Sequence, residues 1–400
     1  MNHICMISNQ YPPYFRGGDA IACQTLSEGL INIGYNVQVI FDIYGYKYIS
    51  KTKGKIPRKP YIQNKVKIFP FYSGPLTFFL TYSGLFNKNI KLEKYLSKVK
   101  PDIIHFHNFS AFGWSALKSA KQIGVPIFHT LHDFWIACPR RKESFIECSE
   151  FCFDCQIKDL KIPNFSHWNY VDFINMAICP SQYMIDTIKK KYRNLKCIKI
   201  PLSLNENNIH NFPKSVIKNF RKKYGNMNTR FGIFVGSLIE RKGIYDLLMA
   251  LNELNENIKI FIIGEDLINI KAYSSNKNIY SKIVYLGKVN NYIKELAFQS
   301  SDFFILPSHW ENCPISLIEA MYFGLPILTT NVGGIPEIIN SNAIIFNSHD
   351  ISAISSGIQK IIHDESLRIK YGHASRERYL KEFSLKTHIN RHNNLIRSFI

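Results

Sequence analysis

Long apolar runs and acidic residues are both scarce in this sequence. No segment reaches the roughly 18 uncharged apolar residues of a membrane-spanning helix. The N-terminal stretch MNHICMISNQYPP lacks the basic start and apolar core of a signal peptide. We therefore expect a cytoplasmic protein. Zinc-finger and RNP-type motifs and a long basic tail are also missing, so we expect no nucleic-acid partner.

The scarcity of acidic residues leaves a strongly basic chain. It has 50 lysine and arginine residues against 30 aspartate and glutamate residues, a formal net charge of +20. Such a surface favours anionic partners, including nucleotide phosphates and anionic lipid headgroups. Two basic or aromatic-rich stretches, 46–63 and 74–86, suggest peripheral contact with the inner face of the cell membrane. The alternative is a solvated basic face together with a buried loop.

Strand-length apolar runs alternate with amphipathic stretches along the whole chain. In the first half the runs are HICMIS, NVQVIFD, VKIFPF, DIIHFH, PIFHT and AICPS; in the second they are FGIFVGS, IKIFIIG, KIVYLG, DFFILPS, PILTT and AIIFN. Helical patterns lie between them, for example at 22–35, 245–254 and 315–324. This alternation predicts an α/β protein with parallel sheets covered on both faces. Because 400 residues exceed one ordinary core, we expect two doubly wound, Rossmann-like domains with a boundary near 199–207.

Ligands of open α/β sheets bind beyond the carboxyl ends of the strands, so residues that follow the strands are site candidates. Gly17 and Gly18 come after the first strand and before a helix, where a backbone can approach an anion closely. His107, His132 and Asp133 follow two later strands. A single histidine is more often structural, but several at successive strand ends favour a site. A flexible loop is the alternative for the two glycines.

Basic residues follow the first strand of the second half. Arg241 and Lys242 lie in the loop or first turn before a helix, where a cation opposes the helix dipole. This placement indicates an anionic ligand, although a solvated basic turn is the alternative.

Two carboxylates, Glu311 and Glu319, lie eight positions apart in SHWENCPISLIEAMYFGLPIL, residues 308–328. Pro314 suits the first position of a helix, so Glu311 is expected on the loop and Glu319 within the helix. A carboxylate on that helix could accept hydrogen bonds from a ribose diol, and an acid on the loop could hold sugar hydroxyls. The alternative is a pair of ordinary surface charges at a helix start.

These segments resemble the retaining glycosyltransferases of family 4 (glycosyl transferases group 1), which have the GT-B fold. The stretch PSHWENCPISLIEAMYFGLPILTTNVGGIPEII matches the family's two-glutamate motif, its Gly-x-Pro and its later Gly-Gly-x-Pro-Glu. GSLIERKG resembles the family's phosphate loop, PIFHTLHDFW its histidine-bearing strand end and LGKV its base-binding strand end. The resemblance implies domains 1–202 (acceptor side) and 203–375 (nucleotide-sugar side). It also implies that a C-terminal helix, 376–400, crosses back to the first domain.

The resemblance also implies roles for individual residues. Lys242 with Arg241 would hold the donor diphosphate, and Glu319 the ribose. Glu311 would bind hydroxyls of the donor sugar, and His132 would approach that sugar from the other domain.

Further contacts follow from the same resemblance. Gly18, next to Gly17, marks the loop near the phosphates, and Val289 lies at the nucleobase edge. The chain has Asn-Cys-Pro at 312–314 where many relatives have Gly-Phe-Gly, and Ser237 where many have a phosphate-binding arginine. Because proline has no N–H, backbone contacts to the sugar would come from Cys313 or from Ile315 and Ser316.

The implied reaction moves a sugar from a UDP- or GDP-sugar to a glycan or lipid-linked acceptor, in bacterial surface polysaccharide biosynthesis. We expect no cofactor and no catalytic metal, because protein cations would neutralise the leaving diphosphate. One alternative is a sugar-nucleotide epimerase of the same fold class. Another is a non-enzymatic protein that binds membrane or nucleic acid through its charge.

Nine cysteines in a cytosolic chain are expected to be thiols or metal ligands rather than disulfides. Four of them, Cys138, Cys148, Cys152 and Cys155, fall within eighteen residues and could hold a structural Zn²⁺. The alternative is four reduced thiols, some packed as small apolar groups.

Overall fold

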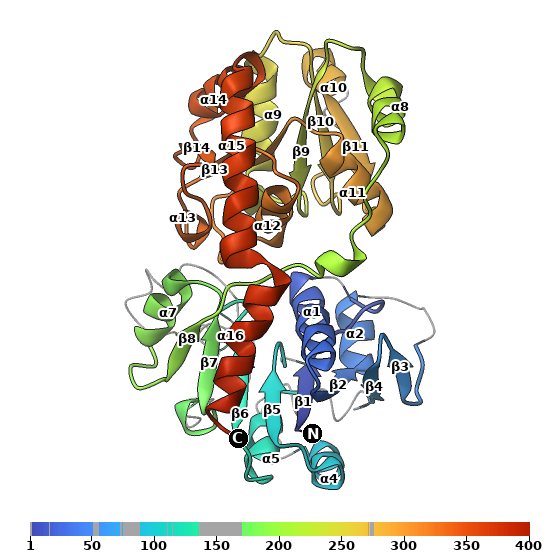
Figure 1. Ribbon diagram of the computed structural model, residues 1–400, viewed down its shortest axis with the longest axis vertical. Helices are drawn as coiled ribbons and strands as arrows, with labels where there is room; N and C mark the ends of the chain where they lie inside the picture. The colour runs from blue at the N-terminus through green and yellow to red at the C-terminus, as the bar shows by residue number, and fades with distance from the viewer. Residues whose placement is uncertain are drawn as a thin grey trace. The chain divides into compact units, whose positions relative to one another are not determined.

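The computed structural model describes residues 2–15, 17–50, 56–72, 74, 89–109, 111–113, 115–134, 136, 170–270, 272 and 276–400. The chain forms two compact units (Figure 1). The first contains Met1–Leu202 and Leu385–Ile400, and the second contains Ser203–Ser384. The division after Leu202 coincides with the boundary placed from the sequence.

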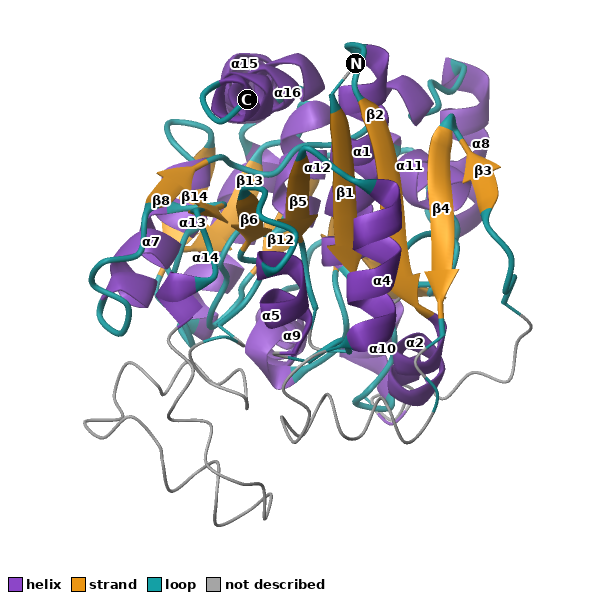
Figure 2. Cartoon of the chain, turned by 90° about the horizontal axis from the view of Figure 1, so that it is seen from below, coloured by secondary structure: helices purple, strands orange, loops and turns teal. Residues whose placement is uncertain are grey.

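The first unit is built on one sheet with the strand order β3-β4-β2-β1-β5-β6-β7-β8 in its described part (Figure 2). The strands are β1 (His3–Ser8), β2 (Asn36–Asp42), β3 (Tyr61–Gln63), β4 (Val66–Phe71), β5 (Ile103–Phe106), β6 (Ile127–Thr130), β7 (Met176–Cys179) and β8 (Cys197–Lys199). Neighbouring strands are parallel except for β3, which pairs antiparallel with β4 at the sheet edge.

Helices connect these strands. They are α1 (Gly18–Asn32), α2 (Ile43–Ser50), α4 (Ile90–Val99), α5 (Ser115–Lys121) and α7 (Gln182–Lys189), with a short 3₁₀ turn, Tyr170–Asp172. The strand order reverses direction at β1, because the chain first adds β2 and β4 on one side and then β5 to β8 on the other. The carboxyl ends of β1 and β5 therefore form the switch point where such sheets bind ligands.

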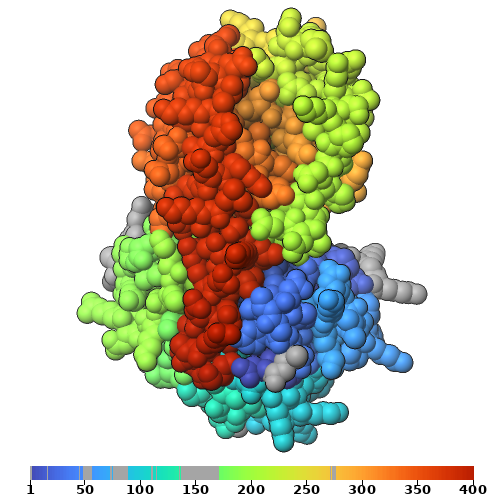
Figure 3. Space-filling model, in the orientation of Figure 1, coloured from blue at the N-terminus to red at the C-terminus, as the bar shows by residue number. Residues whose placement is uncertain are grey.

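The C-terminal helix α16 (Leu385–Arg397) belongs to the first unit. It packs against α1 and lies on the surface beside it (Figure 3). Leu385, Ile389 and Leu395 join the buried cluster formed by residues of α1, β1 and β2. Gly29 allows this close packing, since a Cβ atom there would lie 2.2 Å from Ile389 Cδ1.

The second unit has a parallel sheet with the order β11-β10-β9-β12-β13-β14. Its strands are β9 (Arg230–Val235), β10 (Ile258–Ile263), β11 (Ile283–Gly287), β12 (Phe303–Leu306), β13 (Ile327–Thr330) and β14 (Ala343–Phe346). The central strands are buried along their length, as expected for a sheet with helices on both faces.

The helices of the second unit are α8 (Lys214–Tyr224), α9 (Ile244–Glu253), α10 (Lys277–Lys282), α11 (Asn291–Gln299), α12 (Ile315–Tyr322), α13 (Ile335–Ile338), α14 (Ile351–His363) and α15 (Glu365–Arg378). Two 3₁₀ turns (Glu206–Asn208 and Glu240–Lys242) and a π-helical turn (Tyr379–Phe383) complete it. Among the described residues, no helix combines the length and the apolar character needed to cross a bilayer.

The segment predicted to cross back at 376 does so later, at Leu385, and this part of the prediction is wrong. The reason lies in the side chains at the end of α15. Ser375 Oγ donates to the Leu325 carbonyl at 2.7 Å, and the Arg376 guanidinium lies 4.5 Å from the Tyr322 ring centroid. Arg378 donates to the Glu337 carbonyl at 2.7 Å. These contacts hold the end of α15 on the second unit, and the chain departs only after the π-helical turn.

Candidate active site

Two loops of the second unit meet at the carboxyl ends of neighbouring strands β9 and β12. Gly243 follows β9 with a φ of +66°, and a Cβ atom there would lie 1.8 Å from the Pro307 carbonyl oxygen after β12. The His309 N–H donates to the Arg241 carbonyl at 2.9 Å. Only glycine permits this approach. It places the predicted phosphate loop directly beside the predicted two-glutamate motif.

Glu311 and Lys242 form an ion pair between these loops. The Glu311 side chain is only 7% exposed and that of Lys242 17%, so both charges are largely removed from water. The same carboxylate oxygen accepts a hydrogen bond from Ser308 Oγ at 2.9 Å. Such partners offset the cost of burying a carboxylate. The structure therefore brings together two residues that were predicted separately.

The backbone of Glu311 is held by the later glycine pair of the motif. Gly333 has a φ of +56°, and a Cβ atom there would lie 1.9 Å from the Glu311 carbonyl oxygen. The Gly334 N–H donates to that oxygen at 2.9 Å. The two glycines thus fix the backbone of Glu311 and, with it, the direction in which the Glu311 side chain projects from the loop.

Glu319 lies on α12 and pairs with a residue that the sequence analysis did not single out. Its Oε1 atom is 2.5 Å from the Lys294 Nζ atom on α11, with side-chain exposures of 13% and 24%. A carboxylate has about four acceptor positions, so one ammonium partner leaves capacity for a hydroxyl. The signal for Lys294 was its place on the helix that follows the LGKV strand end.

Trp310 is a second residue that the sequence analysis did not use. The Arg241 guanidinium lies 5.4 Å from the centroid of its ring system. This cation–π contact orients the arginine beside Lys242. The signal was an aromatic residue next to the first glutamate of the motif.

The remaining residues predicted to bind the nucleotide-sugar donor lie at strand ends or helix starts. Val289 is half-buried in the loop between β11 and α11. Ile315 and Ser316 are the first two residues of α12, and Pro314 is its N-cap rather than its first helical residue. The amides of a first helical turn have no partner within the helix and can face a ligand.

In the first unit, His132 and His107 meet at the carboxyl ends of β5 and β6. His107 Nδ1 lies 3.2 Å from His132 Nε2, and the two rings stack with centroids 5.4 Å apart. They line a small cavity together with Asp133. Burial lowers the pKa of His132, and the nearby Asp19 and Asp133 carboxylates oppose that effect. The net direction favours the neutral imidazole at neutral pH.

Gly17 and Gly18 lie at the start of α1 in the same unit. Gly17 is the N-cap and Gly18 the first helical residue, and both are exposed. The Asn108 amide, which follows β5, donates to Asp19 Oδ2 at 3.2 Å in the first turn of α1. The glycines thus lie at the switch point of the first sheet, near the strand end that precedes the histidines.

Two family models match this chain in succession. The model described as Glycosyltransferase Family 4 matches residues 16–201, and the model described as Glycosyl transferases group 1 matches residues 216–378. The chain belongs to the family 4 glycosyltransferases. The two matches follow the two units of the structure in turn.

Curated relatives of this glycosyltransferase carry the same class of name. An uncharacterized glycosyltransferase of Methanocaldococcus jannaschii is 26% identical over 402 residues, covering 91% of this chain and 90% of the relative. The UDP-Gal:alpha-D-GlcNAc-diphosphoundecaprenol alpha-1,3-galactosyltransferase of Escherichia coli is 25% identical over 299 residues, covering 70% and 71%.

This glycosyltransferase has the same GT-B fold as several solved structures of other proteins. Sucrose-phosphate synthase of Thermosynechococcus elongatus superposes with a TM-score of 0.78 at 18% identity, covering 100% of this chain and 99% of that one. The HepE protein of Anabaena, in complex with UDP and glucose, gives a TM-score of 0.72 at 15% identity, covering 100% of both. The predicted fold class is confirmed.

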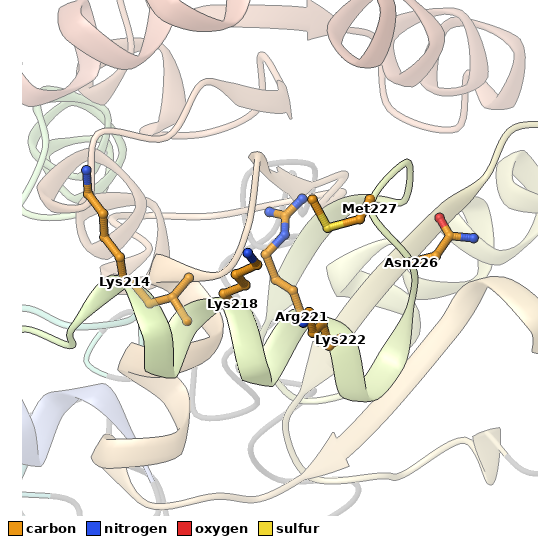
Figure 4. Close-up of a pocket in the computed structure, with 7 residues that line it drawn as sticks. Lys214, Lys218, Arg221, Lys222, Asn226 and Met227 are labelled. Atoms are coloured by element: carbon orange, nitrogen blue, oxygen red, sulfur yellow. The ribbon is translucent and has the colours of Figure 1, made fainter.

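A pocket of about 410 Å³ lies elsewhere in the second unit of the glycosyltransferase, along α8 (Figure 4). None of the predicted site residues lines it. Its arginine, Arg221, is held structurally, since it donates to both carboxylate oxygens of Asp302 at 3.2 and 3.1 Å. We therefore do not place the active site there.

Two sequence hypotheses fall on parts of the glycosyltransferase outside the described residues. Cys138, Cys148, Cys152 and Cys155 all lie there, so the zinc hypothesis stays a prediction. Of the two stretches expected to contact a membrane, residues 51–55 and 75–86 also lie outside.

Proposed function

We propose that this enzyme transfers a hexosyl group from a UDP- or GDP-sugar to a glycan or lipid-linked acceptor, with retention of configuration. The observation that carries the proposal is the pairing of Lys242 with Glu311 across two strand-end loops. In this pair, a cation that would hold a diphosphate lies beside a carboxylate that would bind sugar hydroxyls. The Escherichia coli relative is named for a UDP-sugar donor and a diphospholipid acceptor, and HepE was crystallised with UDP and glucose.

Each end of the donor has a matching group in the second unit. Lys242 and Arg241 would hold the diphosphate, and Glu319, oriented by Lys294, would accept hydrogen bonds from the ribose diol. Val289 would border the base. The N–H groups of Ile315 and Ser316, in the first turn of α12, would add hydrogen bonds to the donor.

Glu311 would bind donor-sugar hydroxyls, and three groups of the first unit complete the proposed set. Neutral His132 would hydrogen-bond the donor sugar, and Gly17 and Gly18 would lie near the phosphates. His107 would keep the His132 ring in place through their 3.2 Å contact.

In the proposed reaction the bond between the anomeric carbon and the diphosphate oxygen breaks, and its electron pair stays on the diphosphate. The acceptor hydroxyl oxygen bonds to the anomeric carbon on the face that the diphosphate leaves, and its proton passes to the leaving phosphate. The products are a glycoside and a nucleoside diphosphate. Positive charge grows on the sugar and negative charge on the leaving group. Lys242 and Arg241 would supply the main electrostatic stabilisation, so the transfer step itself needs no metal ion.

The test measures nucleoside diphosphate release from a panel of UDP- and GDP-sugars, with and without a lipid-linked glycan acceptor. Release that depends on the acceptor, with an unchanged anomeric configuration in the product, supports the proposal. Inversion would refute retention, and interconversion of the nucleotide sugar without an acceptor would favour the epimerase. The family assignment favours the transferase over that alternative.

We also propose that the enzyme works at the cytoplasmic face of the cell membrane in surface polysaccharide assembly. Its net charge of +20 suits anionic headgroups. On the described part of the first unit, Ile62 is 71% exposed and the Arg58 guanidinium lies 5.2 Å from the Tyr72 ring centroid. Sedimentation with anionic and with neutral liposomes tests this. Equal and negligible pelleting with both would remove the membrane proposal while leaving the transferase proposal intact.

A further inference from the structure

A cluster of two histidines and one aspartate lies beside the donor loops, which are the predicted phosphate loop and the loop that begins the two-glutamate motif. Asp246 is in the first turn of α9, His309 is on the loop after β12, and His349 follows β14 just before α14. Helices α9 and α14 pack against each other (Figure 1). The three side chains thus converge from three separate segments.

The ligand atoms of the cluster are close together. His309 Nε2 is 2.8 Å from Asp246 Oδ2, and His349 Nδ1 is 3.6 Å from the same oxygen. All three atoms lie within 4.8 Å of one another, and the two imidazole centroids are 3.8 Å apart.

These distances suit a common metal ion. Zinc bonds of about 2.0–2.1 Å to nitrogen or carboxylate oxygen give a tetrahedron whose ligand atoms are about 3.3 Å apart. The separations of 2.8 and 3.6 Å lie on either side of that value. Adjustments of roughly half an ångström would bring each histidine nitrogen to a tetrahedral edge from Asp246 Oδ2. The two rings would also have to move apart from their 3.8 Å centroid separation to bind one ion.

A hydrogen bond between His309 and Asp246 accounts for only part of the cluster. The second imidazole, that of His349, is also turned towards Asp246, although its side chain is 64% exposed. Its backbone has a φ of +66°, which is uncommon for a residue other than glycine. A divalent cation at this point would accept a lone pair from each imidazole and from the carboxylate.

We infer that Asp246, His309 and His349 form a binding site for one divalent transition-metal ion, of which Zn²⁺ fits best. Two imidazoles and one carboxylate are a usual donor set for such ions. Asp246 is the buried ligand, with a side chain 11% exposed, and His349 gives the ion a path from solvent.

The ion would position the donor loops rather than take part in sugar transfer. His309 lies two residues before Glu311, and its N–H donates to the Arg241 carbonyl at 2.9 Å. Asp246 lies four residues after Lys242. A metal bond between these segments would hold the phosphate loop against the glutamate motif. This consequence rests on the proposed function, but metal binding itself does not.

The experiment titrates the full-length, metal-stripped protein with Zn²⁺ in competition with a chromophoric chelator, and repeats it for His349→Ala and His309→Ala. His373→Ala is the matched control, because His373 is an exposed histidine of α15 outside the cluster. His349→Ala removes an exposed side chain and should leave the fold unchanged. Co²⁺ spectra of the parent and variants separate these ligands from thiolates, since thiolate ligands add a charge-transfer band.

We expect one ion per chain that His349→Ala and His309→Ala lose and His373→Ala retains. The affinity should fall by at least the roughly 10- to 100-fold that loss of an outer-shell partner causes. The Co²⁺ spectrum of this ion should lack a thiolate band. Zinc binding that is absent in the parent, or unchanged in both cluster variants, would overturn the inference whatever the result of the transfer assay.

Discussion

Acidification should destabilise the first unit, because its described part holds five buried histidines and a sixth, His132, that is partly buried. They are His105, His107, His129, His132, His388 and His392. The rings of five of these histidines form a row from the strand ends to α16. The distances between successive ring centroids are 5.4 Å from His132 to His107, 4.6 Å to His105, 5.9 Å to His392 and 4.6 Å to His388. Protonation of this row would place cations inside the core that joins α16 to the sheet.

The direction follows from the pKa values. Burial lowers the pKa of His105 and of His129 to about 3, and that of His388 to about 4. In the unfolded chain a histidine has a pKa near 6.5. Between these values the unfolded state binds protons that the folded state does not bind. The free energy of unfolding is therefore highest above pH 6.5 and falls as the pH drops towards the folded pKa.

The magnitude is large. Each pH unit below 6.5 costs about 1.4 kcal/mol per histidine, or about 2 kcal/mol at pH 5. His105, His129 and His388 together would remove about 6 kcal/mol, a large part of the 5–15 kcal/mol typical of a folded domain. Because His388 and His392 are on α16, we expect this helix to detach from the rest of the first unit before the unit unfolds as a whole.

Urea unfolding at pH 7.5, 6.5 and 5.5, followed by hydrogen exchange in α16, tests this expectation. His388→Asn keeps a donor for the Pro201 carbonyl, which His388 Nδ1 contacts at 2.8 Å, but removes one titrating group. Its slope with pH should be shallower by about 1.4 kcal/mol per unit. The exposed control His373→Asn should keep the slope of the parent. A parent whose unfolding free energy does not change between pH 7.5 and 5.5, or equal slopes in both variants, would refute the reasoning.

Three further changes test the candidate site. Glu319→Gln should weaken donor binding measured by calorimetry without unfolding the protein, because an amide accepts ribose hydroxyls less strongly; unchanged affinity would contradict the ribose assignment. Lys242→Met should lower turnover by about 10²–10³-fold, because the leaving diphosphate loses a cation. It should also destabilise the fold, because Glu311 remains buried without its cation. Adding Glu311→Gln should restore stability, measured by thermal unfolding, but not turnover. Gly243→Ala should destabilise the second unit far more than Gly324→Ala, because the φ values are alike at +66° and +67° but the nearest atoms to a new Cβ lie at 1.8 and 3.5 Å; equal thermal shifts would show that the loops move apart freely.

The strands were predictable from the sequence because each is a short apolar run between polar turns. The exceptions are β3 and β8, which have three residues each and lie at opposite edges of their sheet. Edge strands of that length carry no clear alternation, so the pattern could not separate them from loops.

The candidate site could be predicted from the sequence as a set of strand-end residues but not as a set of ion pairs. Lys242 and Glu311 are 69 positions apart, and Lys294 and Glu319 are 25 apart. Their pairing depends on how closely loops approach, which is decided by backbone conformations such as that of Gly243 and not by local pattern. Lys294 was therefore overlooked, although its helix follows a strand whose end was already assigned.

These pairs explain why two acids lie so close to a run of apolar residues. Glu311 and Glu319 are mostly buried. Glu311 pairs with Lys242 from the loop after β9, and Glu319 pairs with Lys294 from α11. A donor diphosphate would compete with Glu311 for Lys242, since both are anions seeking the same ammonium group. Glu311 would then need new hydrogen bonds, and the hydroxyls of the donor sugar could supply them. Under the proposed function, the ion pair would thus link recognition of the phosphates to recognition of the sugar. A diphosphate without its sugar would leave the buried Glu311 carboxylate with too few hydrogen-bond partners, whereas the intact donor would supply them.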